Sequence, residues 1–323
     1  MDTGYMNITM KEMARKLKEY PAYQIYYHKS PDGDAVTSAY ALALALKSLG
    51  IPCEPVCCDP IPPAYRYLTD PHVFEPLEGC TAIAVDSANA KRLGKNSHVK
   101  ITLCIDHHEN TMEAEFRYVD PERSSCAELI YELIQEMGVP MTKVLADLLY
   151  VGLVTDTRCF RTYSTNVRSL EAAAAMARDG ADIVGIARRH ELEKDARKIE
   201  IEKTIMNHFH YSCAEKVLGT WFSWEDMQRI GVDETELGGL ALIVDQISGL
   251  DIGILIREKS PGHCSVSVRS YRKDINAVEI CSEYGGGGHA DRAGFELEGD
   301  PAAVLSTAEE AAARYLSAQH TVI

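Results

Sequence analysis

The chain has 323 residues, which is enough for two domains with buried cores. Its 48 acidic and 33 basic side chains give a net charge of −15. Because long nucleic acid is bound largely by Lys and Arg that neutralise phosphates, this balance argues against a long duplex as partner and favours small anions. No run of 18 apolar residues occurs, so we expect no membrane span.

The ten cysteines are scattered along the chain, and most lie inside apolar runs, as Cys104 does in Leu-Cys-Ile. This distribution is typical of reduced thiols rather than of a disulfide framework, and we therefore expect a cytoplasmic protein. Cys53, Cys57 and Cys58 form one cluster, but it lacks the spacing and the second ligand pair of a zinc site.

The first part of the chain alternates between strand-like and helical runs. Residues 1–20 carry apolar side chains at helical spacing, with Thr9 or Asn7 as the N-cap. Strands are predicted at 24–28, 53–58, 81–86 and 100–106, and helices near 35–49, 125–137, 141–154 and 167–179. The alternation predicts an α/β domain with a doubly wound parallel sheet.

The second part of the chain has a different pattern. Isoleucines among many charges over 182–211 predict one or two connecting helices. The strand-like runs that follow are Val217–Trp221, Ile252–Arg257, Cys264–Arg269 and Phe295–Leu297, and the helical candidates are Trp224–Ile230, Thr235–Ile247, Asn276–Glu283 and Pro301–Gln319. We therefore predict a first domain over 1–187, a helical linker over 188–215 and a smaller α/β domain over 216–323.

One short segment between the first long strand and its helix concentrates candidate metal ligands. It reads His28-Lys29-Ser30-Pro31-Asp32-Gly33-Asp34. A strand-to-helix turn of this kind lies at the carboxyl edge of an α/β sheet, where ligands usually bind. Imidazole and carboxylate donors suit manganese, iron or zinc, and two carboxylates this close repel each other unless a cation or proton lies between them.

Further acids and histidines end later apolar runs. They are Asp86, the triplet Asp106-His107-His108, and Asp156. Taken singly, His28 is more simply explained as a turn histidine, Asp86 as a cap or turn residue, and the His-His pair as surface residues. Four elements that supply such residues in order instead favour one cleft with two divalent ions, because so much buried negative charge cannot stay unpaired.

These motifs, in this order, resemble the DHH phosphoesterase superfamily. The matching segments are His-x-x-Pro-Asp-Gly-Asp-Ala, Val-Asp, Asp-His-His and Thr-Asp-Thr, and Gly285-Gly286-Gly287-Gly288-His289 with Ala293-Gly294 resembles the signature of the associated DHHA1 domain. The resemblance covers nearly the whole chain, and the stand-alone two-domain type is the most similar. Two positions depart from the family pattern, namely Thr37, where Gly is usual, and Arg292, where Ala is usual.

The resemblance implies a ligand set for two metal ions. The first ion would take His28, Asp32 and Asp86, and the second would take Asp34, Asp86, His107 and Asp156, so that Asp86 bridges both. Asp106 would orient a neighbouring histidine, and His108 would stabilise charge at the scissile phosphate or protonate the leaving oxygen. The mixed donor set favours Mn²⁺, with Mg²⁺ or Co²⁺ as alternatives.

The glycine run in the second domain indicates a phosphate-binding segment. Consecutive glycines such as Gly286, Gly287 and Gly288 let backbone N–H groups approach a phosphate, and His289 adds a donor. Arg269-Ser270 ends a strand-like run, and Arg suits bidentate phosphate contact. A flexible linker is the simpler explanation of a glycine run, but its place after a predicted helix favours a phosphate cradle.

The resemblance leaves several functions open. The leading one is a phosphodiesterase that degrades RNA of about two to five nucleotides to mononucleotides, in keeping with the acidic chain. Alternatives are a phosphodiesterase for cyclic dinucleotides or linear products such as pApA and pGpG, and a phosphatase for 3′-phosphoadenosine 5′-phosphate. A non-enzymatic nucleotide-binding regulator with a vestigial metal site is a further alternative. The resemblance also implies a possible homodimer, because members of the family often dimerise.

Overall fold

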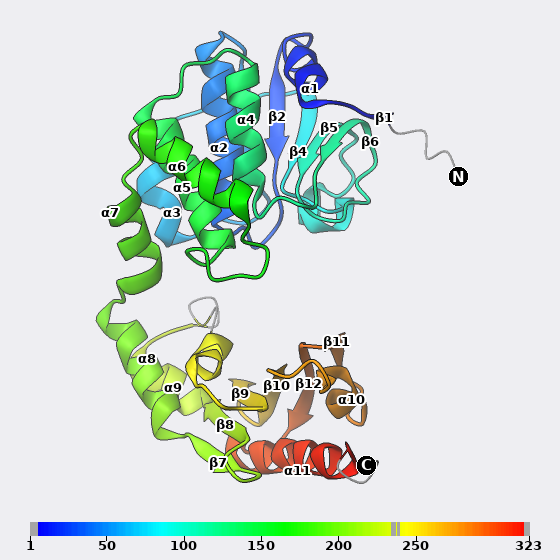
Figure 1. Ribbon diagram of the computed structural model, residues 1–323, viewed down its shortest axis with the longest axis vertical. Helices are drawn as coiled ribbons and strands as arrows, with labels where there is room; N and C mark the ends of the chain where they lie inside the picture. The colour runs from blue at the N-terminus through cyan, green and yellow to red at the C-terminus, as the bar shows by residue number, and fades with distance from the viewer. Residues whose placement is uncertain (1–5, 234–236, 238–239, 320–323) are drawn as a thin grey trace. The chain divides into compact units, whose positions relative to one another are not determined.

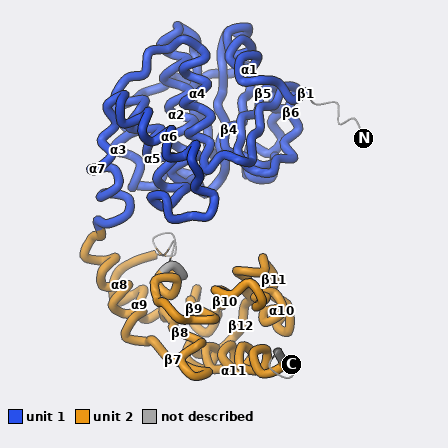
Figure 2. The backbone as a smooth tube through the Cα atoms, viewed as in Figure 1, with its two compact units in different colours: residues 1–193 blue, residues 194–323 orange. Residues whose placement is uncertain are grey.

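The computed structural model describes residues 6–233, 237 and 240–319 of the chain. The chain divides into two compact units, residues 1–193 and residues 194–323 (Figure 2). The boundary lies inside the segment 188–215 that the sequence predicts as a linker. Each unit is an α/β structure, which confirms the predicted fold class.

The first unit is built on a six-stranded sheet in which every neighbouring pair is parallel. Its order is β1 (Met6–Asn7), β6 (Ala114–Val119), β5 (Ile101–Asp106), β4 (Thr81–Val85), β2 (Tyr23–Tyr26) and β3 (Cys53–Val56) (Figure 1). The four predicted strands are confirmed as β2, β3, β4 and β5. The sequence analysis missed β1 and β6, although β6 has the alternating pattern of a strand.

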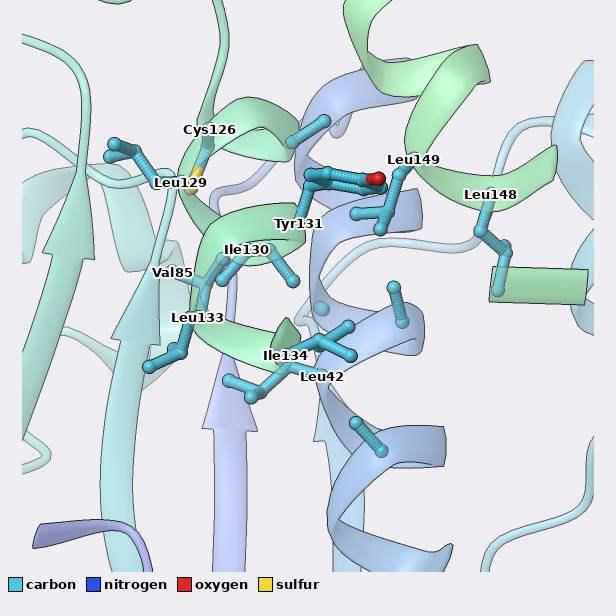
Figure 3. Close-up of a cluster of buried hydrophobic side chains, with 14 of the residues drawn as sticks. Leu42, Val85, Cys126, Leu129, Ile130, Tyr131, Leu133, Ile134, Leu148 and Leu149 are labelled. Atoms are coloured by element: carbon cyan, nitrogen blue, oxygen red, sulfur yellow. The ribbon is translucent and has the colours of Figure 1, made fainter. Parts of the chain in front are cut away.

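Helices of the first unit pack against one face of this sheet and against one another. They are α1 (Met10–Lys16), α2 (Gly33–Ser48), α3 (Pro63–Thr69), α4 (Cys126–Glu136), α5 (Lys143–Asp156), α6 (Val167–Arg178) and α7 (Ile183–Ala187). Figure 3 shows the apolar contacts among α2, α4, α5 and the sheet, to which Leu42, Ile134 and Leu149 contribute fully buried side chains. A smaller cluster with Leu93 and Met112 covers the other face. Thr9 caps α1, as predicted.

The parallel strands place the candidate site. Because β5, β4 and β2 are neighbours and run in the same direction, their carboxyl ends meet at one edge of the sheet. Asp86 and His107 follow directly after β4 and β5, and His28 lies two residues after the end of β2. The first turn of α2 adds Asp34, and the last residue of α5 is Asp156.

The second unit holds a mixed six-stranded sheet. Its order is β11 (Gly287–His289), β12 (Arg292–Glu298), β10 (His263–Ser270), β9 (Ile252–Ser260), β8 (Val217–Phe222) and β7 (His210–Ser212). The β8–β9 pair is parallel and the other pairs are antiparallel. All four strands that the sequence predicted here are confirmed.

Helices lie on both faces of this sheet. α10 (Ala277–Ser282) and α11 (Pro301–Gln319) pack on one face, and α8 (Ala196–Asn207) and α9 (Trp224–Ile230) pack on the other. Of the predicted helix 235–247, residues 240–246 form a 3-10 helix, whereas 234–236 and 238–239 lie outside the described residues. Near the end of the first unit, a π-helical turn at Arg188–Leu192 follows α7. Within the described ranges, the helices lack the combined length and apolarity that a membrane crossing requires.

We expect Gly152→Ala to destabilise the first unit. Alanine normally stabilises a helix interior relative to glycine by about 1 kcal/mol. At this position in α5, however, a Cβ atom would lie 2.7 Å from both the Ala127 Cβ and the Asp34 carboxylate. Such overpacking costs about 1–3 kcal/mol, so thermal denaturation should show a lower Tm. Val144→Ala on the exposed side of the same helix is the control, and a Tm for Gly152→Ala at or above wild type would contradict the prediction.

Candidate active site

Two histidines point their Nε2 atoms toward buried carboxylates. The Nδ1 atom of His28 lies 2.8 Å from the carbonyl oxygen of Lys29, and that of His107 lies 3.3 Å from the carbonyl oxygen of Arg123. A carbonyl oxygen only accepts hydrogen bonds, so Nδ1 carries the proton and Nε2 of the neutral ring keeps its lone pair. Histidines that bind metals are usually oriented in this way.

The clustered side chains form three overlapping groups, one of which consists of Asp86, Asp106, His107 and His108. The ligand-type atoms of His28, Asp32 and Asp86 lie within 4.8 Å of one another, and the same holds for those of Asp34, His107 and Asp156. The His28 Nε2 atom is 3.5 Å from Asp32 Oδ2 and 3.6 Å from Asp86 Oδ2. The His107 Nε2 atom is 3.3 Å from Asp86 Oδ1, so Asp86 lies between these last two groups. The structure thus brings all six predicted metal ligands together.

Asp86 and Asp34 are held in place by the backbone around them. Asp86 follows β4 with a φ of +52°, a left-handed conformation that Asp tolerates better than most residues, and its side chain is 2% exposed. The Asp34 side chain is fully buried and accepts hydrogen bonds from the N–H groups of Cys126 and Ala127 at the start of α4. The positive end of the α4 helix dipole therefore stabilises its negative charge.

The buried carboxylates of the cluster carry more negative charge than the surrounding groups neutralise. Burial, followed by the charge of Asp34, raises the pKa of Asp86 well above its usual value. Burial and Asp34 likewise raise the pKa of Asp156 to about 9. Among the described residues, Asp86 Oδ1 and His107 Nε2 are buried polar atoms without a hydrogen-bond partner. Because unpaired buried polar atoms are costly, these donors fit divalent cations, which would neutralise the cluster.

Asp106 and His108 form a hydrogen-bonded pair beside this cluster. The Asp106 side chain is fully buried, and its Oδ1 atom accepts from the N–H of His107 at 2.8 Å. The same oxygen lies 2.8 Å from Nδ1 of His108, and Asn110 donates to the other oxygen. The bond to Asp106 raises the pKa of His108, whose side chain is 43% exposed. His108 is therefore fixed at one ring nitrogen while part of the ring faces solvent.

Tyr65 on α3 is a neighbour of the cluster that the sequence analysis missed. Burial, and next the negative charge of Asp32, raises its pKa to about 12. Its ring stacks on His190 of the π-helical turn, with 5.6 Å between ring centroids, and Tyr67 Oη lies 3.0 Å from His190 Nε2. The only sequence signal was the Pro62-Pro63 pair that starts α3, because no local pattern shows where a tyrosine ring will point.

The second unit contains a cavity of about 470 Å³. Four of the predicted substrate-binding residues line it, namely Arg269, Gly287, Gly288 and His289. Ser270 and Gly286 are not among the lining residues. The Ser270 hydroxyl donates to the carbonyl oxygen of Arg272, and a Cβ at Gly286 would lie 2.5 Å from the carbonyl oxygen of Gly294. Arg292 also lines the cavity.

Comparison with known protein families agrees with both units. Residues 23–153 match the model of the DHH family, N-terminal domain, and residues 215–318 match the DHHA1 domain. The first match contains five of the six clustered ligand-type residues, and the second contains the cavity. The chain belongs to the DHH family of phosphoesterases, with a C-terminal DHHA1 domain.

Individual relatives match over nearly their whole length. A Thermus thermophilus protein described as bifunctional oligoribonuclease and PAP phosphatase NrnA is 31% identical, over 90% of this chain and 89% of the relative. The Mycoplasma genitalium protein of the same description is 25% identical over 88% of this chain and 92% of the relative. An exopolyphosphatase-related protein from Bacteroides fragilis has the same fold, with a TM-score of 0.81, 20% identity and coverage of 95% and 96%.

We expect Mn²⁺ to stabilise the protein through the acidic cluster. Ligand binding to the folded state contributes about 2.7 kcal/mol when free Mn²⁺ is about 100 times Kd, which raises Tm. Asp86→Asn should abolish this rise, because Asp86 lies between both ligand groups. In EDTA the variant should be no more than about 1 kcal/mol less stable than wild type, since a neutral amide adds no charge to the cluster and tolerates the positive φ.

Asp70→Asn, an exposed change outside the cluster, is the control for this experiment. It should respond to Mn²⁺ as the wild type does. An unchanged Mn²⁺ response in Asp86→Asn would contradict the assignment of metal binding to this cluster.

Proposed function

We propose that this phosphoric ester hydrolase degrades RNA of about two to five nucleotides to mononucleotides in a metal-dependent reaction. The observation that carries the proposal is the convergence of two histidines and four aspartates at one sheet edge, with unpartnered buried atoms on Asp86 and His107. The oligoribonuclease description of two relatives that match most of this chain supports RNA as the substrate. The net charge of −15 favours short over long strands.

Two divalent ions are the cofactors in this proposal. His28, Asp32 and Asp86 would hold one ion, and Asp34, Asp86, His107 and Asp156 would hold the other. When bound, such a pair activates water and neutralises charge on the scissile phosphate. The mixed imidazole and carboxylate donors suit Mn²⁺, with Mg²⁺ or Co²⁺ as alternatives.

Asp106 and His108 would act on the substrate side of the cluster. Asp106 holds Nδ1 of His108 at 2.8 Å and so keeps the imidazole in one orientation. The partly exposed His108 ring is suited to stabilise charge on the phosphate or to donate a proton to the leaving oxygen. Asp106 would be a positioning residue, since its oxygens are occupied by the N–H groups of His107, His108 and Asn110.

The cavity of the second unit would bind the substrate away from the reacting phosphate. Arg269 and His289 supply cationic or donor groups, and Gly287 and Gly288 allow close approach of a phosphate to the backbone. Ser270 and Gly286 would support this segment from outside the cavity. We propose that the protein cleaves RNA in the cytoplasm, because its ten free cysteines suit a reducing compartment. A homodimer stays a prediction.

Hydrolysis of 3′-phosphoadenosine 5′-phosphate is a second proposed activity. It is supported by the PAP phosphatase part of the relatives' descriptions. The same metal cluster would serve both reactions, because each breaks a phosphorus–oxygen bond next to a nucleoside. The two activities should therefore fall together when a metal ligand is removed.

A substrate panel tests the proposed function. Purified protein with Mn²⁺ would receive a dinucleotide, a pentanucleotide and a long RNA strand, together with cyclic di-AMP and 3′-phosphoadenosine 5′-phosphate. We expect fastest turnover of the short RNAs and loss of all activities in Asp156→Ala, because Asp156 lies 3.3 Å from His107 Nε2 in the cluster.

Other outcomes of this panel would change the assignment. A strong preference for cyclic di-AMP or its linear product would assign the protein to cyclic-dinucleotide turnover. Absence of any hydrolysis would support the regulator alternative. Activity retained in Asp156→Ala would contradict the role of the cluster.

A further inference from the structure

Three basic side chains lie side by side across the second sheet. Arg269 of β10 is the direct partner of Arg292 on β12, and Arg292 is the direct partner of His289 on β11. Side chains of directly opposite residues project from the same face of a sheet, with Cβ atoms about 4.5–5.5 Å apart. All three residues line the 470 Å³ cavity, so they form a row at one end of it.

Nearby acids do not neutralise this row. Among the described residues, Arg292 forms an ion pair only with the neighbouring Asp291, where Nε and Oδ1 are 3.9 Å apart, beyond hydrogen-bond distance. In the described part of the chain, no carboxylate lies within ion-pair distance of Arg269 or His289. Like charges directly opposite on neighbouring strands destabilise a sheet. An anion with more than one negative charge would relieve this repulsion.

The residues along the rest of the cavity differ from one end to the other, and this difference would orient a bound anion. The next row along the strands consists of Ser267, Gly294 and Gly287, and a Cβ at Gly287 would meet nothing within 4 Å. Beyond it lies Glu296, which accepts a hydrogen bond from Lys259 at 2.7 Å. The cavity floor thus extends about 14 Å along β10 from the row of basic side chains, over a surface without bulky side chains, to Glu296, which is ion-paired with Lys259.

We propose that Arg292 is a specificity-determining residue that selects nucleotides ending in a phosphomonoester. Arg292 would act with Arg269 and His289 on the phosphate, while the nucleoside lies over Gly287 and Gly294 toward Glu296. A phosphomonoester carries nearly two charges at neutral pH, whereas a terminal hydroxyl carries none. The planar fork of Arg binds phosphate oxygens in pairs, so a second Arg favours the monoester strongly. This inference rests on the proposed function for its choice of a nucleotide ligand.

Calorimetric titration of the full-length protein tests the inference without turnover. In EDTA, which removes any metal contact to phosphate, 5′-AMP should bind the wild type more tightly than adenosine does. Arg292→Ala should weaken 5′-AMP binding about tenfold, the loss expected for one charge-assisted contact, and leave adenosine binding unchanged. Arg292→Lys should fall between the two, since it keeps the charge but loses the fork.

Arg314→Ala is the matched control. Arg314 is 54% exposed against 57% for Arg292, pairs with Glu283 at 2.9 Å and does not line the cavity. The Arg314→Ala substitution removes one positive charge from the second unit, as Arg292→Ala does, and should leave 5′-AMP binding at the wild-type value. Equal affinities for 5′-AMP in wild type and Arg292→Ala would overturn the inference, as would a failure of the wild type to prefer 5′-AMP over adenosine.

Turnover separates this inference from the proposed function. With Mn²⁺, the wild type should cleave pApA in preference to ApA, and Arg292→Ala should reduce that preference about tenfold through KM while kcat is kept. Binding of 5′-AMP that depends on Arg292, without hydrolysis of either dinucleotide, would leave the inference standing and remove the proposed function. Hydrolysis with an unchanged preference in Arg292→Ala would do the reverse.

Discussion

Repulsion among buried carboxylates is the constraint on which the first unit depends. Asp34 and Asp86 are almost fully removed from water, and Asp156 lies with them around His107. Burial and mutual charge raise the pKa values of all three above the ordinary range. Such an arrangement is stable with its charges intact only when positive charge lies among them. The cluster is therefore suited to cations, and backbone N–H groups at the start of α4 hold Asp34 in place within it.

The scaffold accepts local strain and close packing in order to do this. Asp86 has a left-handed backbone conformation. Shortly after the end of α5 at Asp156, three consecutive residues have the same conformation, namely Arg158, Cys159 and Phe160. Left-handed non-glycine residues cost about 1–2 kcal/mol each, and they persist where the surrounding structure fixes them. Gly152 lets α5 approach α2 so closely that the Asp34 carboxylate lies next to it. Within the described part of the first unit, the left-handed non-glycine residues thus follow β2, β4 and α5, whereas the second unit has a left-handed run of its own at Cys213, Ala214 and Glu215.

The two units divide opposite electrostatic tasks between them. The first unit gathers acids and neutral histidine nitrogens, which select cations. The second presents a row of basic side chains in a cavity with a glycine floor, an environment suited to anions. A net charge of −15 is compatible with both environments. The basic side chains of Arg269, Arg292 and His289 are gathered side by side on three neighbouring strands, so they form a local positive site on an acidic protein. A phosphorylated substrate with its metal ions needs both kinds of environment.

The residue pattern alone predicted most of the strands and helices and the type of chemistry at the sheet edge. Apolar runs ending in His28, Asp86 and Asp106-His107-His108 predicted parallel strands whose ends meet, because local periodicity encodes secondary structure and parallel strands share an edge. The short β1 and β11 gave too little pattern to be predicted. Only the tertiary structure placed Arg292 between Arg269 and His289 and brought Tyr65 to the cluster. Strand register and side-chain direction depend on pairing between distant segments, which no local pattern contains.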